Sequence, residues 1–374
     1  MTDRLFIEFH IIQSLPPNNM NRDDTGSPKT AIFGGVRRAR VSSQAWKKAT
    51  RDVFSSILDE EDLGTRTKYA VDLIAEQITH AAPEYSQDSI TMAADVLGAT
   101  GIQVKSDKNG KQTTGALFFI SGAQSRDLAN LAIESRNDGI AIDKKIAKSI
   151  LDVKKNASDN AVDIALFGRM VADAPDLNVD AACQVAHAIS IHKADTEFDY
   201  YTAMDDLTPE DNAGAGMIGT IEFTSSVLYR YATIDVPHLM SNLGDSAEAT
   251  ARAVRAFAHA FITSMPTGKQ NTFANRTLPA AVLVQTRNTQ PVSLANAFEE
   301  PIEPKGEKGR IQLACEALVD QEKMLDDAFD VAPLQTFAVL GAPQTEALLN
   351  LGEKVSLSEL ENRLDQAVRA WSQE

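Results

Sequence analysis

Apolar residues recur at every second position near the start of the chain, which predicts a strand over residues 4–12. The residues expected on its buried side are Leu5, Ile7, Phe9 and Ile11. The two prolines at 16 and 17 are expected to end this strand, because proline cannot donate to a strand ladder. Residues 31–41 predict a short strand or hairpin arm, with a tight bend at Gly34 and Gly35.

The spacing of apolar residues then changes from that of a strand to that of a helix. A helix is expected to begin at Ser42 or Ser43, where a serine side chain can cap its first turn. Its apolar stripe comprises Trp46, Ala49, Val53 and Ile57. A second face carries Gln44, Lys47, Lys48 and Arg51. Basic side chains therefore form a row beside a helix N-terminus, whose free N–H groups also favour anions.

Farther along, residues 60–156 are mostly helical in pattern, interrupted by one hairpin with a type I′ turn at Asn109-Gly110. The remaining pattern predicts a strand at 161–170, a helix at 181–193, a strand at 219–235, a helix at 246–263, strands near 278–286 and two amphipathic C-terminal helices. Strands and helices in this order favour an α+β core with two insertions over two serial domains.

Composition limits the class of protein. The chain has 374 residues, of which 43 % are hydrophobic and 24 % charged, as in an ordinary soluble protein. It contains no apolar run long enough to span a membrane, and its N-terminus lacks a signal-peptide core, so no membrane association is expected. Two cysteines, Cys183 and Cys315, provide no disulfide framework, and a reducing cytoplasm is the simplest location.

Positive charge is concentrated in residues 21–51. The chain as a whole carries a formal charge of -16, whereas this segment holds eight Lys or Arg and two Asp; it is therefore +6 and the rest is -22. Lys and Arg supply charge to phosphates, and Ser, Gln and backbone N–H groups supply geometry. The segment is either a solvated charged face or, as we expect, a binding site for a nucleic-acid backbone.

No pattern of residues predicts catalysis or a metal cofactor. Gly268-Lys269 is followed by Gln270, which does not fit a phosphate-binding loop. His187 and His192 lie five residues apart, which does not place them together on one helical face. Asp23 and Asp24 are either part of a hydrogen-bonded loop or a pair of carboxylates for magnesium or RNA cleavage. We expect the loop, no enzymatic activity and no cofactor.

Several long blocks resemble the CasC family, the backbone subunits of the type I-E CRISPR surveillance complex Cascade. They are NRDDTGSPKTAIFGGVRRARVSSQAWKKATR, AVDIALFGRM, VAHAISIHKADTEFDYYTAMDDL, GTIEFTSSVLYRYATID and PVSLANAFE. The blocks stand in the order of the family between residue 5 and about residue 298. The resemblance therefore covers most of the chain and is specific, although residues 60–150 and the last 75 carry less of it.

The resemblance implies a fold like a right hand. It consists of an RRM-like (ferredoxin-like) palm of residues 1–60, 157–193 and 222–374, a helical finger of 61–156, and a thumb of 194–221. It also implies a non-catalytic role, in which copies polymerise head to tail along the CRISPR RNA (crRNA) and hold it for pairing with target DNA. Further implied partners are the large, small, crRNA-end-capping and crRNA-processing subunits of Cascade.

The resemblance assigns roles to individual residues. Residues at positions that contact the RNA backbone are Arg22, Lys29, Ser42, Gln44, Lys47 and Arg51, and neighbours in the same segment are Arg37, Arg38, Arg40 and Lys48. Residues at positions beside a kinked nucleotide are Arg169, Met170, Tyr200, Tyr201 and Thr202. Met170 is either a wedge between bases or a core residue, and the tyrosines either stack on bases or anchor the thumb.

Two other functions remain open at this point. One is an endoribonuclease that uses Asp24, because related backbone subunits of type III complexes cut RNA with an aspartate. The other is a standalone RNA chaperone, which would bind as a monomer without fixed spacing. The thumb is acidic, with seven Asp or Glu between residues 195 and 211, so its acidic residues are expected to face a neighbouring subunit or solvent.

Overall fold

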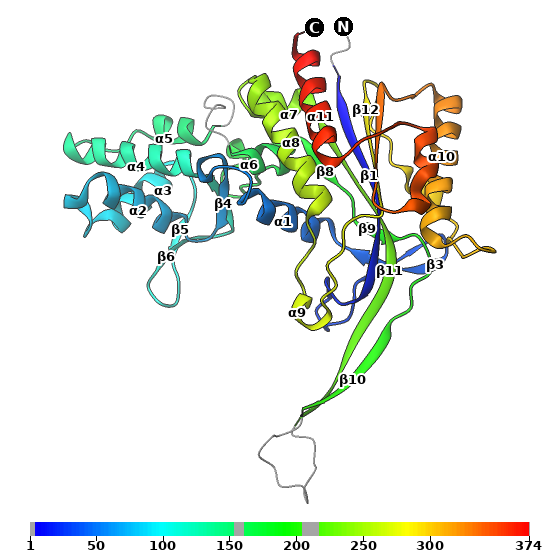
Figure 1. The fold of residues 1–374 in the computed structure, drawn as a ribbon. Coiled ribbons are helices and arrows are strands. Elements are labelled where there is room, and N and C mark those ends of the chain that lie inside the picture. The colour runs from blue at the N-terminus through cyan, green and yellow to red at the C-terminus, as the bar shows by residue number, and fades with distance from the viewer. Residues whose placement is uncertain (1–3, 153–160, 204–216, 374) are drawn as a thin grey trace, which may run out of the picture.

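A computed structural model describes residues 4–152, 161–203 and 217–373. Figure 1 shows three parts: a central sheet flanked by helices, a helical lobe to one side, and a long two-stranded ribbon that projects away from the sheet. The mixture of one large sheet and many helices confirms the α+β class. Within the described part, no helix is long and apolar enough to cross a membrane.

The central sheet runs in the order β14-β13-β12-β1-β11-β9-β3-β2, with β8 and β10 also paired to β11. Its strands are β1 (Phe6–Asn18), β2 (Thr30–Phe33), β3 (Val36–Val41), β8 (Cys183–Val185), β9 (Ala188–Ser190), β10 (Glu197–Ala203), β11 (Met217–Asp235), β12 (Ala281–Arg287), β13 (Gln335–Leu340) and β14 (Glu353–Lys354). The described pairs are antiparallel except β13 with β14. β1 lies between β11 and β12 and is the centre of the sheet.

Two hydrophobic layers cover the two faces of this sheet. The odd positions of β1 join a core formed with α1 (Ser43–Phe54), α7 (Val236–Asn242), α8 (Ala247–Thr263) and α11 (Leu357–Gln373), so the predicted alternation is confirmed. On the other face, Ile12 belongs to a second core with α10 (Arg310–Phe329). Figure 1 shows α8 and α11 on one side of the sheet and α10 on the other.

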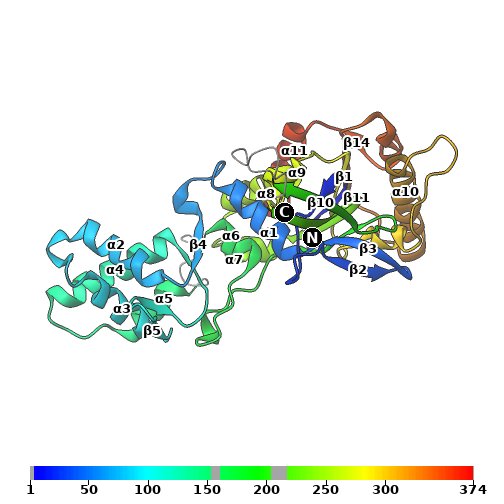
Figure 2. The same ribbon diagram turned by 90° about the horizontal axis from the view of Figure 1, so that it is seen from below.

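The helical lobe has a hydrophobic core of its own, built from α2 (Ala70–Ala81), α3 (Ser89–Ala99), α4 (Gly122–Asn137) and α5 (Lys144–Leu151). The predicted hairpin is present as β5 (Val104–Ser106) with β6 (Gln112–Thr114). β4 (Gly64–Thr67) pairs with β7 (Phe118–Ser121); the chain enters the lobe through β4, and β7 leads into α4 and α5 of the lobe. Figure 2 shows the lobe beside the sheet, reached from α1 through β4.

Four local predictions were wrong. β1 continues through Pro16 to Asn18, because the prolines fall at a register shift between Leu15 and Asn18, where ladder bonds are already interrupted. Residues 161–170 contain helix α6 (Val162–Phe167) rather than a strand, since a short buried apolar run does not distinguish the two. The expected helix at 181–193 is instead β8 and β9, which pair with β11.

The fourth correction concerns a turn. Only Gly110 of the Asn109-Gly110 pair has a positive φ, so the turn is not type I′; Asp107 instead accepts hydrogen bonds from the backbone N–H groups of Asn109 and Lys111. At Gly34-Gly35 the tight bend is confirmed, because both residues have positive φ angles of 57° and 75° between β2 and β3. That bend lies at the tip of a basic hairpin.

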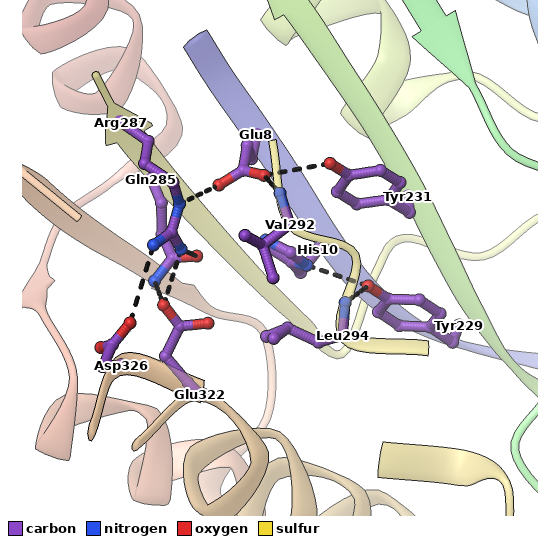
Figure 3. A network of polar contacts seen from close by, with 10 residues as sticks. All are labelled: Glu8, His10, Tyr229, Tyr231, Gln285, Arg287, Val292, Leu294, Glu322 and Asp326. Atoms are coloured by element: carbon purple, nitrogen blue, oxygen red, sulfur yellow. Dashed lines mark hydrogen bonds and ion pairs between the residues drawn. The ribbon is translucent and has the colours of Figure 1, made fainter. Parts of the chain in front are cut away.

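A buried polar network lies on the face of the sheet toward α10 (Figure 3). Arg287 of β12 donates to Glu8 of β1 at 2.8 Å and to Glu322 of α10 at 2.8 Å, and lies 3.6 Å from Asp326. Glu8 also accepts from the Tyr231 hydroxyl and the Val292 N–H group. The network therefore ties three strands, one helix and the segment after β12 together, and of its charged members only Asp326 is partly exposed.

Candidate nucleic-acid interface

Helix α1 presents the predicted basic row. Its N-cap is Ser42, whose hydroxyl accepts from the N–H group of Ala45 at 3.3 Å, and the Ser42 N–H group donates to the Asn21 side chain at 2.8 Å. Trp46 is fully buried, and the guanidinium of Arg230 lies 3.7 Å from its ring centroid. The buried tryptophan thereby fixes the helix on the sheet, and Gln44, Lys47 and Lys48 lie on the side of the helix away from the sheet.

A cleft of about 930 Å³ separates α1 from the base of the helical lobe. Gln44, Lys47, Lys48 and Arg51 line it from α1, and Arg169 and Met170 line it from the turn after α6. Other lining residues include Arg66, Leu117, Phe119 and Phe167, together with two acidic residues, Asp52 and Asp180. The structure therefore brings the basic row and the Gly168-Arg169-Met170 turn, more than 100 residues apart in sequence, to one concave surface with cationic and apolar walls.

The three cations of α1 in this cleft differ in their contacts. Lys47 Nζ lies 5.5 Å from the Phe167 ring centroid, and Lys48 forms an exposed ion pair with Asp52 at 2.7 Å. Arg51 is 23 % exposed in its side chain; its Nε donates to Asp163 at 2.9 Å and its guanidinium lies 4.4 Å from the Phe119 ring centroid. Lys47 and Lys48 are thus freer to meet a ligand than Arg51 is.

The basic hairpin and the loop before it lie close to the N-terminus of α1. Arg22 and Arg37 are exposed, and Lys29 and Arg40 are half-buried. His187 Nδ1 lies 3.3 Å from Arg40 Nη1 and accepts from the Ser43 N–H group at 3.2 Å. Burial, and then Arg40 and Lys29, lower the pKa of His187, so the imidazole is neutral at pH 7. This histidine is part of the basic surface and was not predicted to be.

Arg38 does not belong to this surface. Its side chain is fully buried, and its guanidinium donates to the backbone carbonyl groups of Phe33, Ser190, Phe298 and Glu299. The alternation of β3 turns Arg37 and Arg38 to opposite faces, which the run of arginines in the sequence conceals. The expected phosphate contact of Arg38 is therefore corrected to a structural role.

Replacement of Arg38 by alanine is expected to lower the free energy of unfolding by about 2–3 kcal/mol, because buried carbonyl groups lose their charged donor. Thermal unfolding of the chain measures this loss. Arg37→Ala, one position away and exposed, is the matched control and should leave the melting temperature within about 1 °C. Equal melting temperatures for the two variants would contradict the structural role.

Arg169 is likewise buried, whereas Met170 is 79 % exposed. Arg169 donates to the carbonyl groups of Leu177, Phe119 and Leu151 and to the Gln124 side chain, and burial lowers its pKa to about 10. Gly168 has a φ of 77°, and a side chain there would meet the Val179 carbonyl. Arg169 thus anchors the turn and projects Met170, so a wedge fits Met170 better than a core role does.

The aromatic residues on the ribbon of β10 and β11 differ in how exposed their side chains are. Tyr200 is 64 % exposed and Phe198, on the same side of β10, is 67 % exposed. Tyr201 is opposite Gly219, and its ring occupies the space that a side chain at Gly219 would need. Tyr200 and Phe198 are available for stacking, and Tyr201 packs on the ribbon. Thr202 is exposed.

The acidic positions Asp205, Asp206, Glu210 and Asp211 lie outside the described residues. Asp23 accepts hydrogen bonds from Thr25 and Ser27, which lower its pKa, so Asp23 organises its loop as predicted. Asp24 is exposed. Across residues 4–152, 161–203 and 217–373, no group of three or more His, Cys, Asp or Glu side chains could hold a metal ion.

Sequence reasoning missed Asp163, Arg66, His187 and Phe198. Asp163 lies within a block that carries the resemblance, but nothing near it signals a partner 112 residues away. Arg66 follows the lobe entry and faces α1 only in the folded chain. Phe198 could have been found, because it alternates with Tyr200 in a strand pattern.

Comparisons with known proteins agree with this architecture. A solved chain titled "CRISPR RNA-guided surveillance complex, pre-nicking" is 31 % identical, with a TM-score of 0.83 over 98 % of this chain and 99 % of that one. Another, titled "CRISPR RNA-guided surveillance complex", is 28 % identical, with a TM-score of 0.73 over 98 % and 99 %. No curated protein matches the chain.

The fold is thus that of the subunits in those solved structures of CRISPR RNA-guided surveillance complexes. A family model described as "CT1975-like protein" matches residues 7–363. The chain belongs to this family of Cas proteins, and the resemblance to CasC is confirmed.

Proposed function

We propose that this chain is a non-catalytic backbone subunit of a type I-E CRISPR surveillance complex. Copies polymerise head to tail along the crRNA, each holding a segment of guide that pairs with target DNA. The observation that carries the proposal is the cleft between α1 and the lobe, lined by Lys47, Lys48, Arg51 and Arg66 in a chain of net charge -16. Two relatives of nearly equal length come from RNA-guided complexes, which supports the same role.

The chemistry of the cleft suits a phosphate backbone rather than a base sequence. The cations that α1 and β4 contribute to it are Lys47, Lys48, Arg51 and Arg66, and the Gln44 amide adds a neutral donor. Met170 at the wall of the cleft, and Phe198 and Tyr200 on the ribbon outside it, supply exposed apolar surface against which bases of any identity can pack. A subunit of this kind delegates sequence recognition to the guide itself.

The proposal includes an RRM-like palm. In support, the central strands lie in the order β12-β1-β11, and α1 and α8 pack on one face of them. The large, small, crRNA-end-capping and crRNA-processing subunits of Cascade would bind the ends and flanks of the filament. An open head-to-tail assembly presents a different surface to each neighbour.

Nuclease footprinting of RNA that copurifies with the chain tests the proposal. A ladder of evenly spaced protected segments is expected, because identical subunits cover equal lengths of RNA. A smear would indicate a standalone chaperone. Regular cuts in complementary RNA with Mg²⁺, abolished by Asp24→Ala, would indicate the endoribonuclease instead.

A further inference from the structure

The contacts around Arg51 join the palm helix to the helical lobe. Arg51 lies on α1, Asp163 lies in the first turn of α6, and Gly64 and Phe119 belong to the paired strands β4 and β7 that precede the helices of the lobe. We call these four residues the clasp. It spans one wall of the cleft to the other, so its geometry determines how far α1 stands from the lobe.

Both carboxylate oxygens of Asp163 and two of the three guanidinium nitrogens of Arg51 have specific partners in the clasp. Asp163, almost fully buried, accepts from Arg51 Nε at 2.9 Å through one oxygen and from the Gly64 N–H group at 2.9 Å through the other. Arg51 Nη2 donates to the Gly64 carbonyl at 3.2 Å. Among the described residues these bonds engage Nε and Nη2 of Arg51, so Nη1 remains for a ligand in the cleft.

The packing of the clasp leaves little freedom. The guanidinium of Arg51 lies over the Phe119 ring, and a side chain at Gly64 would come within 2.7 Å of that ring and 3.1 Å of Asp163. Burial raises the pKa of Asp163, and Arg51 opposes that shift. A buried carboxylate without its guanidinium is costly, so the pair is strongly constrained to stay together.

We propose that Asp163 is a positioning residue for RNA binding: through Arg51 it holds α1 and the lobe at the separation that lets both walls of the cleft contact one phosphate backbone. This rests on the proposed function. Asp163 is itself negative and close to the cleft, so its charge alone would weaken the attraction between the cleft and RNA. Its contribution is therefore geometric, and that makes the sign of a substitution informative.

Asp163→Asn and Asp52→Asn provide a matched pair, because each removes one negative charge beside the same cleft. Asp52 is exposed and pairs with Lys48, so Asp52→Asn should free Lys48 and bind single-stranded RNA more tightly. In Asp163→Asn an amide NH₂ must face Arg51 Nε or the Gly64 N–H group, and the clasp opens. RNA affinity should then fall, by about tenfold, within the range of coupling between contacting residues.

Fluorescence anisotropy of a labelled RNA oligonucleotide with the full chain, over a series of salt concentrations, measures both effects. If Asp163 acts by positioning the two walls, the affinity of Asp163→Asn for RNA should depend less steeply on salt, since fewer phosphates are held at once. If Asp163 acted only through its negative charge, its removal should make the salt dependence steeper. In an Arg51→Ala background, Asp163→Asn should cause no further loss of affinity and should raise the melting temperature, because the unpaired buried carboxylate is removed.

Two further variants test the clasp even if Asp163→Asn does not fold. Arg51→Lys keeps the charge but removes the hydrogen bond to Gly64 and the stacking, and Gly64→Ala intrudes on Phe119; both should weaken RNA binding. Binding as tight as the parent chain in Asp163→Asn and Arg51→Lys would overturn the clasp. Failure of the parent chain to bind RNA would instead overturn the proposed function.

Discussion

Replacing Arg287 with alanine is expected to lower the free energy of unfolding by about 3–5 kcal/mol, because it removes the cation of a buried ionic network. Arg287 is fully buried and is shared by Glu8, Glu322 and Asp326 (Figure 3). Without it, carboxylates from β1 and α10 face each other with no opposing charge. Denaturant unfolding followed by circular dichroism measures the loss.

The loss should depend on pH in a defined direction. Burial raises the pKa of Glu8 and of Asp326 above the values of the unfolded chain, so these groups favour the folded state most when protonated. The stability that these protonated groups contribute is fully present at pH values below their pKa in the unfolded chain. It is lost as the pH rises through their pKa in the folded chain. Removal of Arg287 raises these pKa values further, so the variant should be least stable at neutral pH and recover part of the loss near pH 4–5.

Arg363→Ala is the control for this experiment, because Arg363 forms an exposed ion pair with Glu353 at 3.0 Å. Loss of an exposed pair costs at most about 1 kcal/mol. Equal losses in the two variants, or a loss in Arg287→Ala that does not change between pH 7 and pH 5, would show that the network does not carry the stability assigned to it.

The second large effect concerns RNA. Lys47→Ala combined with Arg51→Ala should weaken binding of single-stranded RNA by at least about tenfold at physiological salt, equally for all sequences. Lys47 supplies a charge at the cleft, and Arg51 supplies both a charge and the attachment to the lobe. The slope of log affinity against log salt should decrease by about 0.7 for each phosphate that the protein no longer neutralises.

Arg136→Ala combined with Lys148→Ala removes the same charge from the surface of the lobe, where each residue pairs with an exposed aspartate. This control should leave both affinity and salt slope close to those of the parent chain. A similar reduction in both double variants would mean that RNA responds to net charge and not to the cleft. If the slope of log affinity against log salt is unchanged in the variant with Lys47→Ala and Arg51→Ala, this face of α1 does not contact phosphate.

Local sequence signals predicted much of the fold. Alternation in β1 and β11, the serine cap of α1, the paired glycines between β2 and β3, and the periodicity of α8 each arise from chemistry within a few residues. The failures have a common origin. Residues 161–170 and 181–193 are short apolar stretches, and their state depends on partners distant in sequence: Asn242 donates to the Ala165 carbonyl, and β11 pairs with β8 and β9.

The candidate site divides in the same way. The sequence by itself determined that a basic row lies along α1, because this follows from residue type and spacing, whereas the roles expected for Met170 and the tyrosines near residue 200 came from the resemblance to CasC. Only the tertiary structure decided which cations are free. Arg38 and Arg169 look like surface arginines, yet backbone carbonyl groups surround them. Burial depends on the packing of distant segments, and Asp163 meets Arg51 only when α1 and the lobe come together.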